Sequence, residues 1–339
     1  MKQFAFAATI AGLLAVIAAV PAAAGRLEEV KQRGVLRCGV LANSAGQSML
    51  DDRGEWKGFG IDYCRAVAAA IFDDPSKVEF RPAALGQHLA ALKSGELDIL
   101  EATLTYTMTR EVDLGFSFVG PTIFSGLAFM VPRSLKISSI KELNGATICL
   151  EAGSLVEETL PTLFKANGIT FKPLSLATPQ QIYAMYDRGR CDAVTGDRSG
   201  LAARRLERPH PNAHVILDQS YSKSDTGPVV RSGDAAWLYV AKYTFYALVT
   251  AEELGITQAN VEQIKKSPAR DIRTFLGLDG HNGSKLGLRD DWTVSVIRSV
   301  GNYGEIWDRN LGKESPLQLP RDENRLRRDG GLLFSPSWK

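Results

Sequence analysis

Residues 91–100, ALKSGELDIL, decide the fold, because a second copy of the same pattern, MYDRGRCDAV, stands at residues 185–194. Each copy reads as the end of a helix, a turn on a glycine, one aspartate and a short apolar strand. The glycines are Gly95 and Gly189, and the aspartates are Asp98 and Asp192. One α/β unit that is used twice predicts two similar lobes.

The repeat also points to a pair of residues that could bind a ligand. When the two copies are superposed, Thr103 and Asp197 fall at the same point, just past the strand. In open α/β sheets, ligands bind beyond the carboxyl ends of the strands. We therefore expect these two residues to face each other across a cleft, one on each lobe.

Around the repeat, the chain alternates strand-like and helix-like stretches, which predicts an α/β fold with parallel sheets and helices on their faces. The first run has strands at 35–41, 77–81 and 97–100 and helices at 61–72 and 87–93. The second run begins near Gly145, with strands at 147–151, 170–173 and 192–195 and helices at 156–164 and 179–186. A strand at 229–231 follows, and then helices from Asp234 to about 253, at 259–275 and at 291–310.

The chain is expected to cross between the lobes twice, near 122–126 and near 222–227. Lobe 1 is then discontinuous, with residues 25–123 and 228–339, and lobe 2 comprises residues 124–227. Two crossings form a hinge, at which a few backbone torsions allow the lobes to close on a ligand.

The N-terminus has the composition of a secretory signal peptide, residues 1–24. It has one cation, Lys2, then an apolar run at about 4–20 and small residues up to Ala24, after which cleavage is expected. The alternative is a retained membrane anchor, but the run is short for a span of roughly 20 strongly apolar residues. Loss of Lys2 lowers the formal net charge from +2 to +1, which argues against a nucleic-acid or anionic-membrane partner.

The chain has four cysteines, an even number, and in an oxidising compartment this predicts two disulfides. Three pairings can be drawn. Cys38–Cys64 with Cys149–Cys191 is the pairing that stays within the lobes and leaves them free to move. Four buried free thiols are the alternative. No metal-spaced His or Cys cluster and no cofactor fingerprint occurs in the sequence, so neither a metal nor a cofactor is predicted.

Two further segments offer groups for a charged ligand. Arg110 closes the stretch TLTYTMTR at 103–110, and its planar guanidinium suits a carboxylate. Ser154 ends EAGS at 151–154, where free amides at a helix start attract anions. Each has a simpler reading: Arg110 could pair with a neighbouring acid, and Ser154 could cap its own helix. Asp197 could likewise bind an ammonium group or cap the helix that follows.

The sequence resembles the periplasmic substrate-binding proteins of amino-acid ABC importers, in particular the general L-amino-acid-binding branch. The resemblance is carried by a collinear series: DYCRAVAAA at 62–70, SGELD at 94–98, FMVP at 129–132, ELNGA at 142–146, GRCD at 189–192, GITQANV at 255–261 and VGNYGEI at 300–306. All four cysteines match those of the branch. The resemblance implies the type II periplasmic binding protein fold, with two similar α/β lobes joined by a hinge.

The resemblance also implies roles for single residues. Arg110 would bind the ligand's α-carboxylate, helped by Thr105 and the backbone at Ser154. Asp197 would bind the α-amino group, helped by Thr103.

Several positions depart from the family pattern. Leu155 stands where a threonine is usual, Leu85 and Gln47 stand where aromatics are common, and Leu127 replaces a polar group. The leucines favour a ligand with an uncharged side chain.

The function that the resemblance implies is a periplasmic receptor, a monomer without cofactor, that delivers an amino acid or a derivative to the permease subunits of an ABC importer. The chain has no phosphate-binding loop of the Gly-x-x-x-x-Gly-Lys type, so it is not the importer's ATPase. The alternative is a periplasmic, dehydratase-like enzyme on the same fold, with Glu101, Asp225 or His88 as acid or base. A sensor that reports ligand to a membrane partner is a third hypothesis.

Overall fold

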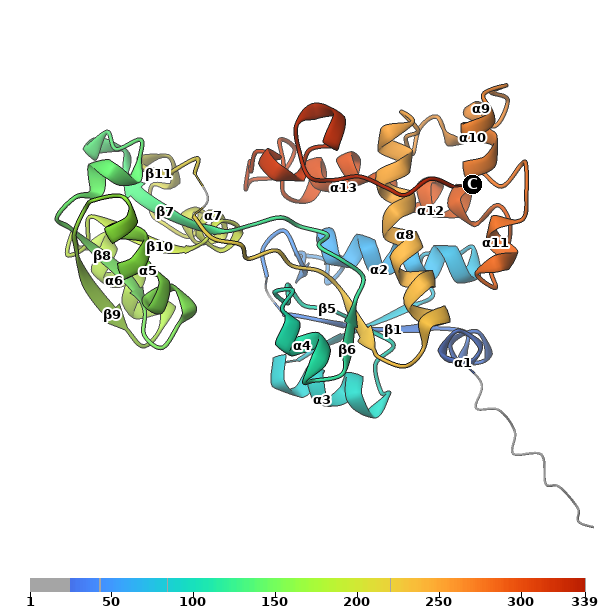
Figure 1. Ribbon diagram of the computed structural model, residues 1–339, viewed down its shortest axis with the longest axis horizontal. Helices are drawn as coiled ribbons and strands as arrows, with labels where there is room; N and C mark the ends of the chain where they lie inside the picture. Colours follow the sequence, from blue (N-terminus) through green and yellow to red (C-terminus); the bar gives the residue numbers. More distant parts are fainter. Residues whose placement is uncertain (1–24, 43, 84, 220, 339) are drawn as a thin grey trace, which may run out of the picture.

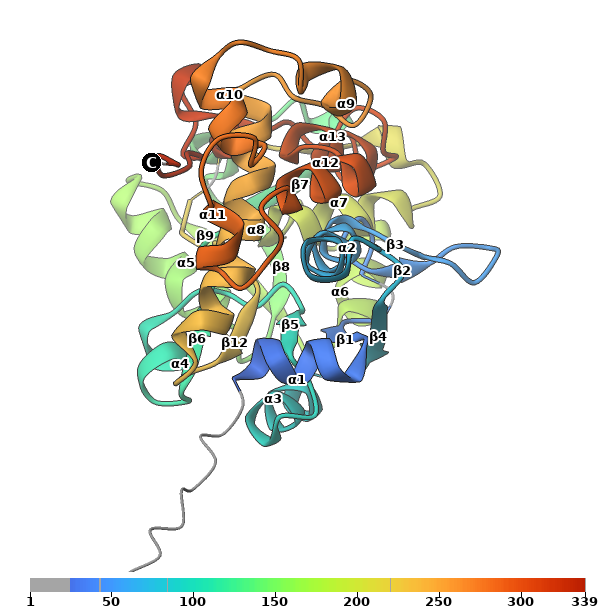
Figure 2. The ribbon, with the colours of Figure 1, turned by 90° about the vertical axis from the view of Figure 1, so that its right-hand side faces the viewer.

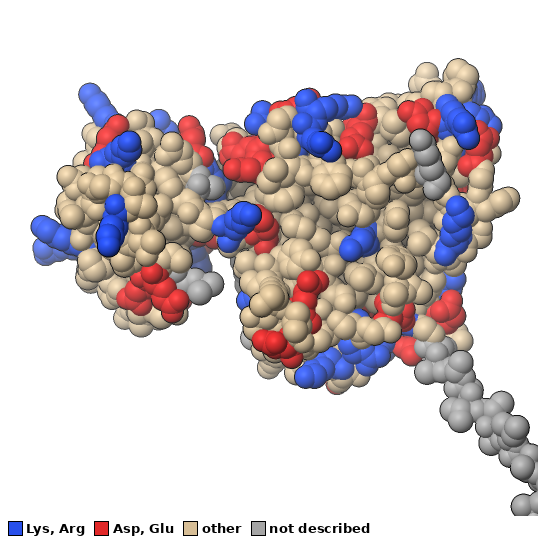
Figure 3. Space-filling model, viewed as in Figure 1, with Lys and Arg blue, Asp and Glu red and all other residues tan. Residues whose placement is uncertain are grey.

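Two five-stranded sheets form two α/β lobes, which stand apart and are joined by a narrow waist (Figure 1, Figure 3). This computed structural model describes residues 25–42, 44–83, 85–219 and 221–338. The expected signal peptide, residues 1–24, lies outside the described residues. Within the described part, no helix has both the length and the hydropathy of a membrane span.

The first sheet has the strand order β4-β1-β5-β12-β6, and its strands are β1 Leu36–Val40, β4 Val78–Pro82, β5 Ile99–Glu101, β6 Phe116–Phe118 and β12 Val229–Arg231. β1 runs parallel to β4 and β5, whereas β12 is antiparallel to both of its neighbours. Helices α2 and α8 lie on one face of this sheet and α3 lies on the other (Figure 1, Figure 2). The helices of this lobe are α1 Arg26–Arg33, α2 Phe59–Phe72, α3 Leu85–Ser94, α4 Met108–Val112, α8 Ala235–Glu253, α9 Val261–Ile264, α10 Arg270–Phe275, α11 Asn282–Lys285, α12 Trp292–Val300 and α13 Tyr303–Asn310.

The second sheet has the order β11-β7-β10-β8-β9, and its strands are β7 Leu127–Pro132, β8 Ala146–Glu151, β9 Phe171–Leu176, β10 Ala193–Asp197 and β11 His214–Ile216. β8 runs parallel to β9 and β10, and β7 is antiparallel to β10 and β11. Its helices are α5 Leu155–Ala166, α6 Pro179–Asp187 and α7 Arg198–Leu206. A hairpin of β2 Met49–Leu50 and β3 Trp56–Lys57 stands beside the first sheet. Single 3₁₀ turns lie at Arg133–Leu135, Ile140–Leu143, Pro211–Ala213, Asp322–Asn324 and Arg327–Asp329.

The predicted repeat is confirmed, because its two copies make the same contacts. In lobe 1, the Asp98 carboxylate accepts a 2.7 Å hydrogen bond from the backbone N–H of Arg37, at the start of β1. In lobe 2, the Asp192 carboxylate accepts one of 2.7 Å from the N–H of Thr147, in β8. Each aspartate thus fixes the first strand of its lobe to the strand that ends at the cleft.

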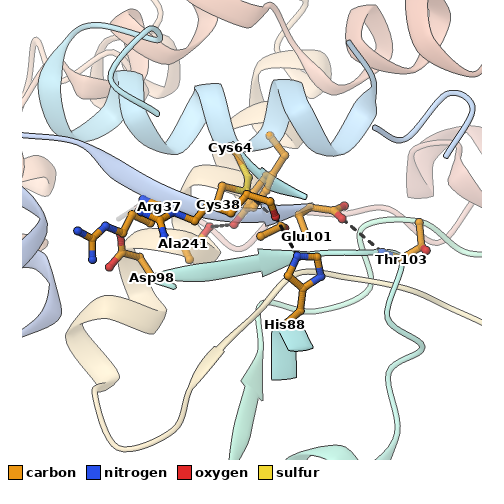
Figure 4. Close-up of a disulfide and its surroundings, with 11 residues drawn as sticks. Arg37, Cys38, Cys64, His88, Asp98, Glu101, Thr103 and Ala241 are labelled. Carbon is orange, nitrogen blue, oxygen red and sulfur yellow. Dashed lines mark hydrogen bonds between the residues drawn. A yellow bond between two sulfur atoms is a disulfide. The ribbon is translucent and has the colours of Figure 1, made fainter. Parts of the chain in front are cut away.

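Each lobe also has one disulfide within it, as predicted. Cys38 in β1 is bonded to Cys64 in α2 (Figure 4). Cys149 in β8 is bonded to Cys191, two residues before β10. All four cysteines are used, so the free-thiol alternative is wrong. Neither bond crosses between the two sheets.

The chain passes between the two sheets twice, after β6 and before β12, and the two passages are hydrogen-bonded side by side. Ile123 exchanges backbone hydrogen bonds with Thr226. Gly227 packs so closely that an added Cβ would stand 2.0 Å from the carbonyl oxygen of Gly120. The amide of Asn324, near the C-terminus, bonds both the N–H and the C=O of Phe124, at 2.8 Å each. The C-terminal segment therefore holds one of the two passages.

Two predicted helices are wrong, and both are divided in two. The helix expected at 259–275 ends as α9 and restarts as α10, because Pro268 lacks the N–H that a continuous helix needs. The helix expected at 291–310 stops at Gly301, which has φ 77°, and restarts at Asn302. Asn302 and Glu305 form a reciprocal cap there, and this cap begins α13.

Candidate functional site

A cavity of about 360 Å³ lies between the lobes beside the two passages. Thr103 and Thr105 line it from lobe 1, and Asp197 lines it from lobe 2. Ser125 and Thr226 close it on the side of the passages. The structure thus brings three of the predicted site residues to one cavity, and two of them, Thr103 and Asp197, are the pair that the superposed repeats place at the cleft.

The lobe 1 wall follows directly from β5. Thr103 has φ 49°, a left-handed backbone conformation that is unusual for a β-branched residue. Its N–H points to the carboxylate of Glu101 at 3.5 Å, as Figure 4 shows. Glu101 is 4 % exposed, forms no ion pair within the described residues, and burial raises its pKa to about 7. The wall is therefore backed by a buried carboxyl group.

The lobe 2 wall is the end of β10, where Asp197 also begins α7. One carboxylate oxygen accepts hydrogen bonds from the N–H groups of Ser199 and Gly200, which is the capping role. The other oxygen accepts a 2.7 Å hydrogen bond from the hydroxyl of Ser125. Asp197 is partly exposed in the cavity, so it both caps the helix and faces the space between the lobes.

Arg110 does not form the local ion pair that was its simpler reading. Its guanidinium donates to the backbone carbonyl of Thr105, and the described residues offer it no carboxylate partner. The neighbouring carboxylate of Glu111 instead accepts the N–H of Phe118 at 3.1 Å. Partial burial lowers the pKa of Arg110. Arg110 is not among the cavity-lining residues, but it is attached through Thr105 to the chain that lines the cavity.

Ser154 and Leu85 are not among the residues that line the cavity. Ser154 caps α5: its hydroxyl accepts the N–H of Glu157 and donates to the carbonyl of Glu151. Leu85 begins α3 and packs on the small apolar cluster beneath β5. Leu155 begins α5, and its side chain lies outside the described part.

The expectation that Leu127 gives the cavity an apolar wall is wrong. Leu127 is 3 % exposed and lies in the core of lobe 2. The cavity is lined mainly by small and polar residues instead.

The acid and base candidates of the enzymatic alternative have structural surroundings. Asp225 accepts the backbone N–H of Ser125 at 3.3 Å, and burial raises the pKa of its carboxyl. His88 is 1 % exposed and its ring Nε2 contacts the carbonyl of Arg81 at 2.8 Å. Among the residues that the structure describes, no three His, Cys, Asp or Glu side chains come together to hold a metal.

Sequence reasoning missed part of the lobe 2 wall. Gly200, Ala203, Arg204 and Glu207 follow Asp197 along one face of α7 and line the cavity with it. Their spacing of three, four and seven residues is that of one helix face, and this signal was readable in the sequence. Gln47 of lobe 1 also lines the cavity. It was noted only as a departure from the family.

The comparisons with known proteins agree with this architecture. The profile of the bacterial extracellular solute-binding proteins, family 3, matches residues 36–268. The general L-amino acid-binding periplasmic protein AapJ of Rhizobium johnstonii is 42 % identical over 338 residues, 99 % of either chain. The glutamate/glutamine/aspartate/asparagine-binding protein BztA of Rhodobacter capsulatus is 41 % identical over 340 residues, 100 % of either chain.

A solved structure matches as well. The periplasmic binding protein of an ABC transporter from Brucella ovis, with glutathione bound, is 43 % identical and superposes with a TM-score of 0.83. The match covers 93 % of this chain and 100 % of the Brucella chain. The chain therefore belongs to the bacterial extracellular solute-binding proteins, family 3, and is a binding protein rather than the dehydratase-like enzyme considered above.

Proposed function

We propose that this protein works as a monomer in the periplasm, captures an amino acid or an amino-acid derivative between its lobes, and delivers it to the permease subunits of an ABC importer. The observation that carries the proposal is the inter-lobe cavity, which Thr103 and Thr105 line from lobe 1 and Asp197 lines from lobe 2. A free amino acid is a dipolar ion, so it needs an acid for one end and a cation for the other.

The cation in this proposal is Arg110. Its guanidinium has no carboxylate partner in the described chain, and it bonds the carbonyl of Thr105, a cavity residue. A partly desolvated guanidinium binds a carboxylate strongly, because two parallel charge-assisted hydrogen bonds can form. Arg110 and Asp197 would thus bind the two ends of one ligand from opposite lobes.

Closure of the lobes completes the site in this proposal. Residues 25–123 and 228–339 would move as lobe 1 and residues 124–227 as lobe 2, about the passages near Ile123 and Thr226. Closure would bring the backbone at Ser154 and Leu155 towards the carboxylate held by Arg110, and Leu85 towards the ligand's side chain. A ligand that contacts both lobes favours the closed form by its differential affinity for it.

The relatives support an amino-acid ligand without defining its side chain. Two of them are amino-acid-binding proteins by name, and the Brucella protein holds glutathione, a tripeptide. L-Glutamine, L-glutamate, L-alanine and glutathione are therefore the first ligands to titrate into the chain from residue 25 onwards by isothermal calorimetry. The proposal predicts saturable binding of at least one; binding of none would contradict it.

The Arg110→Ala variant tests the carboxylate contact. We expect it to weaken amino-acid binding on the order of 100-fold, because about two charge-assisted hydrogen bonds are lost. The matched control is Arg133→Ala, since Arg133 also donates to a backbone carbonyl, that of Asn212, but lies on lobe 2 and does not line the cavity. Equal binding by the two variants would contradict the role of Arg110. A large fall in the melting temperature of the ligand-free Arg110→Ala variant would identify Arg110 as structural.

The Asp197→Asn variant tests the amino-group contact. Asparagine caps a helix as well as aspartate does, so the fold should keep its stability. We expect binding of an amino acid to weaken at least tenfold, and binding of its deaminated analogue to change far less. Asp234→Asn, at the cap of α8, is the control. Equal losses for both ligands would argue against contact with the amino group.

A further inference from the structure

The inter-lobe cavity extends well beyond the residues that would hold the two ends of an amino acid. From Asp197 it continues along α7 past Gly200 and Ala203 to Arg204 and Glu207. Arg204 lies seven residues after Asp197, which is about two helical turns or roughly 10 Å along the axis. That length is the reach of about three extended residues. The cavity therefore has space for a ligand much longer than a common amino acid.

Between Asp197 and Arg204, helix α7 presents small residues to the cavity. Gly200 has no side chain, and a Cβ added there would have no heavy atom within 4 Å. Ala203, one turn further, presents only a methyl group to the cavity. The next residues on the other face of the helix, Leu201 and Ala202, are buried in the protein. The helix thus presents a narrow trough that runs from the acid at Asp197 to the cation at Arg204.

Gln47 lines the cavity from lobe 1, and the acceptor of its side-chain amide is unused in the described part of the chain. Its side chain is 4 % exposed and lines the cavity, and its Oε1 has no hydrogen-bond partner among the described residues. A buried amide oxygen without a partner is costly, and native structures seldom keep one without a reason. An N–H group of a ligand would satisfy it.

The position of Gln47 is fixed by its backbone, so it is a built part of the wall. Its N–H donates to the carbonyl of Ser44, and its carbonyl accepts the N–H of Gly60 in α2. Gly58 approaches it so closely that an added Cβ would stand 2.1 Å from the Gln47 carbonyl oxygen. The backbone of Gln47 is thus held at both its N–H and its C=O, which fixes the point from which the side chain starts.

Arg204 is held in place while part of its guanidinium stays free. Its Nη1 donates to both carboxylate oxygens of Glu207, at 3.0 and 2.9 Å. These are the hydrogen bonds that the described residues give to its side chain, so Nε and Nη2 have no partner among them, and the side chain is 39 % exposed. A guanidinium oriented in this way suits a planar carboxylate.

We propose that this trough is a second subsite, which selects amino acids whose long side chain has an N–H midway and a carboxylate at its end. Gln47 accepts from the N–H, and Arg204 binds the terminal carboxylate. A γ-glutamyl dipeptide has this chemistry. The inference rests on the proposed amino-acid binding at Asp197 and Arg110, and it adds a ligand class and two specificity residues to that function.

The test uses three ligands and two variants of the chain from residue 25 onwards, with calorimetric titration as the measurement. L-Alanine probes the amino-acid site alone, γ-glutamyl-methylamide adds the N–H, and γ-glutamyl-glycine adds the N–H and the terminal carboxylate. We expect the wild type to bind γ-glutamyl-glycine about tenfold more tightly than the methylamide.

The variants assign the two contacts separately. Arg204→Met should abolish the preference for γ-glutamyl-glycine over the methylamide, and Gln47→Leu should weaken both about tenfold while L-alanine binding stays unchanged. Arg190→Met removes an exposed arginine that precedes β10, at the end of the strand opposite Asp197, and controls for net charge.

The possible failures are distinguishable. If the wild type binds L-alanine but prefers neither glutamyl compound, the second subsite is rejected and the proposed function stands. Equal weakening of all three ligands by Gln47→Leu and Arg204→Met also rejects it, because the residues would then act on the whole cleft. If the wild type binds neither glutamyl compound, the subsite is rejected, and if it also binds none of L-alanine, L-glutamine, L-glutamate and glutathione, the proposed function is overturned as well.

Discussion

The two lobes repeat one α/β unit, yet the equivalent residues of that unit are buried very differently. The side chain of Asp98 in lobe 1 has no exposed surface and lies against the guanidinium groups of Arg26 and Arg33. Asp192, its counterpart in lobe 2, is exposed, and among the described residues its carboxylate accepts a hydrogen bond from the N–H of Thr147 alone. The same local pattern is thus a structural anchor in one lobe and a surface contact in the other, because the long helix α8 and the N-terminal helix α1 cover lobe 1.

The residues that precede the cleft differ in the same way. Glu101 in lobe 1 is a buried carboxyl group whose only hydrogen bond in the described structure comes from the N–H of Thr103 at 3.5 Å. The superposed position in lobe 2 is Thr195, whose hydroxyl donates to the carbonyl of Ala128 at 2.9 Å. Lobe 1 therefore carries a titratable group behind its wall of the cleft, and lobe 2 carries a neutral, satisfied one.

The largest contrast is expected between the two aspartates. Asp98→Ala should lower the free energy of unfolding by roughly 3 kcal/mol, because it leaves the N–H of Arg37 and two arginines without their buried acceptor. Asp192→Ala should cost about 1 kcal/mol or less, since water replaces the exposed carboxylate. Urea unfolding of the ligand-free protein measures both. Equal losses would show that the lobes depend on the repeat to the same extent.

The next contrast concerns pH. Burial raises the pKa of Glu101 from 4.5 to about 7. Between these two pH values the carboxyl ionises in the unfolded chain but stays protonated in the folded protein. The free energy of unfolding is therefore highest below pH 4.5 and falls as the pH rises to about 7. Glu101→Gln should remove this fall, which amounts to roughly 2–3 kcal/mol for a shift of this size. Tyr63, from α2, is the other titratable group coupled to it, and the pKa of Tyr63 lies well above this range.

The control for the pH experiment comes from the other lobe. Thr195→Val should lower the free energy of unfolding by about 1 kcal/mol at every pH, because it removes one neutral hydrogen bond. Urea unfolding between about pH 4 and pH 8 follows both variants. If Glu101→Gln keeps the wild-type pH profile, the Glu101 carboxyl is not the group that titrates.

The sequence predicts features that depend on neighbouring residues, such as apolar periodicity and helix caps, but it does not predict contacts between distant residues. The repeat, the parallel strands and the cap at Asp234 could be predicted, since apolar spacing and capping chemistry act within a few residues. Pro268 and Gly301 are local signals that a helix ends, but the apolar spacing continues past both, so each predicted helix was drawn too long. The attachment of Asn324 to the passage at Phe124 joins residues 200 positions apart, and no local pattern indicates such a contact.

The site was predictable to the same extent. Thr103 and Asp197 follow strand ends and could be placed at the cleft from the repeat alone, whereas Thr105 was expected there from the family resemblance. The free acceptor of Gln47 and the burial of Glu101 depend on which elements cover them, so only the tertiary structure shows them. The sequence left open whether Arg110 pairs with a neighbouring acid. The structure shows that it does not pair with Glu111, because the Glu111 carboxylate accepts the N–H of Phe118 instead.

The central claim is that the two lobes close on one dipolar ligand held by residues of both. Small-angle X-ray scattering tests this claim most directly. The radius of gyration of the protein is measured without ligand and with a saturating concentration of an amino acid that calorimetry has shown to bind. We predict that the ligand reduces the radius of gyration of the wild type, and that the Asp197→Asn variant needs at least a tenfold higher ligand concentration for the same reduction. Identical scattering of the wild type with and without bound ligand would contradict the claim.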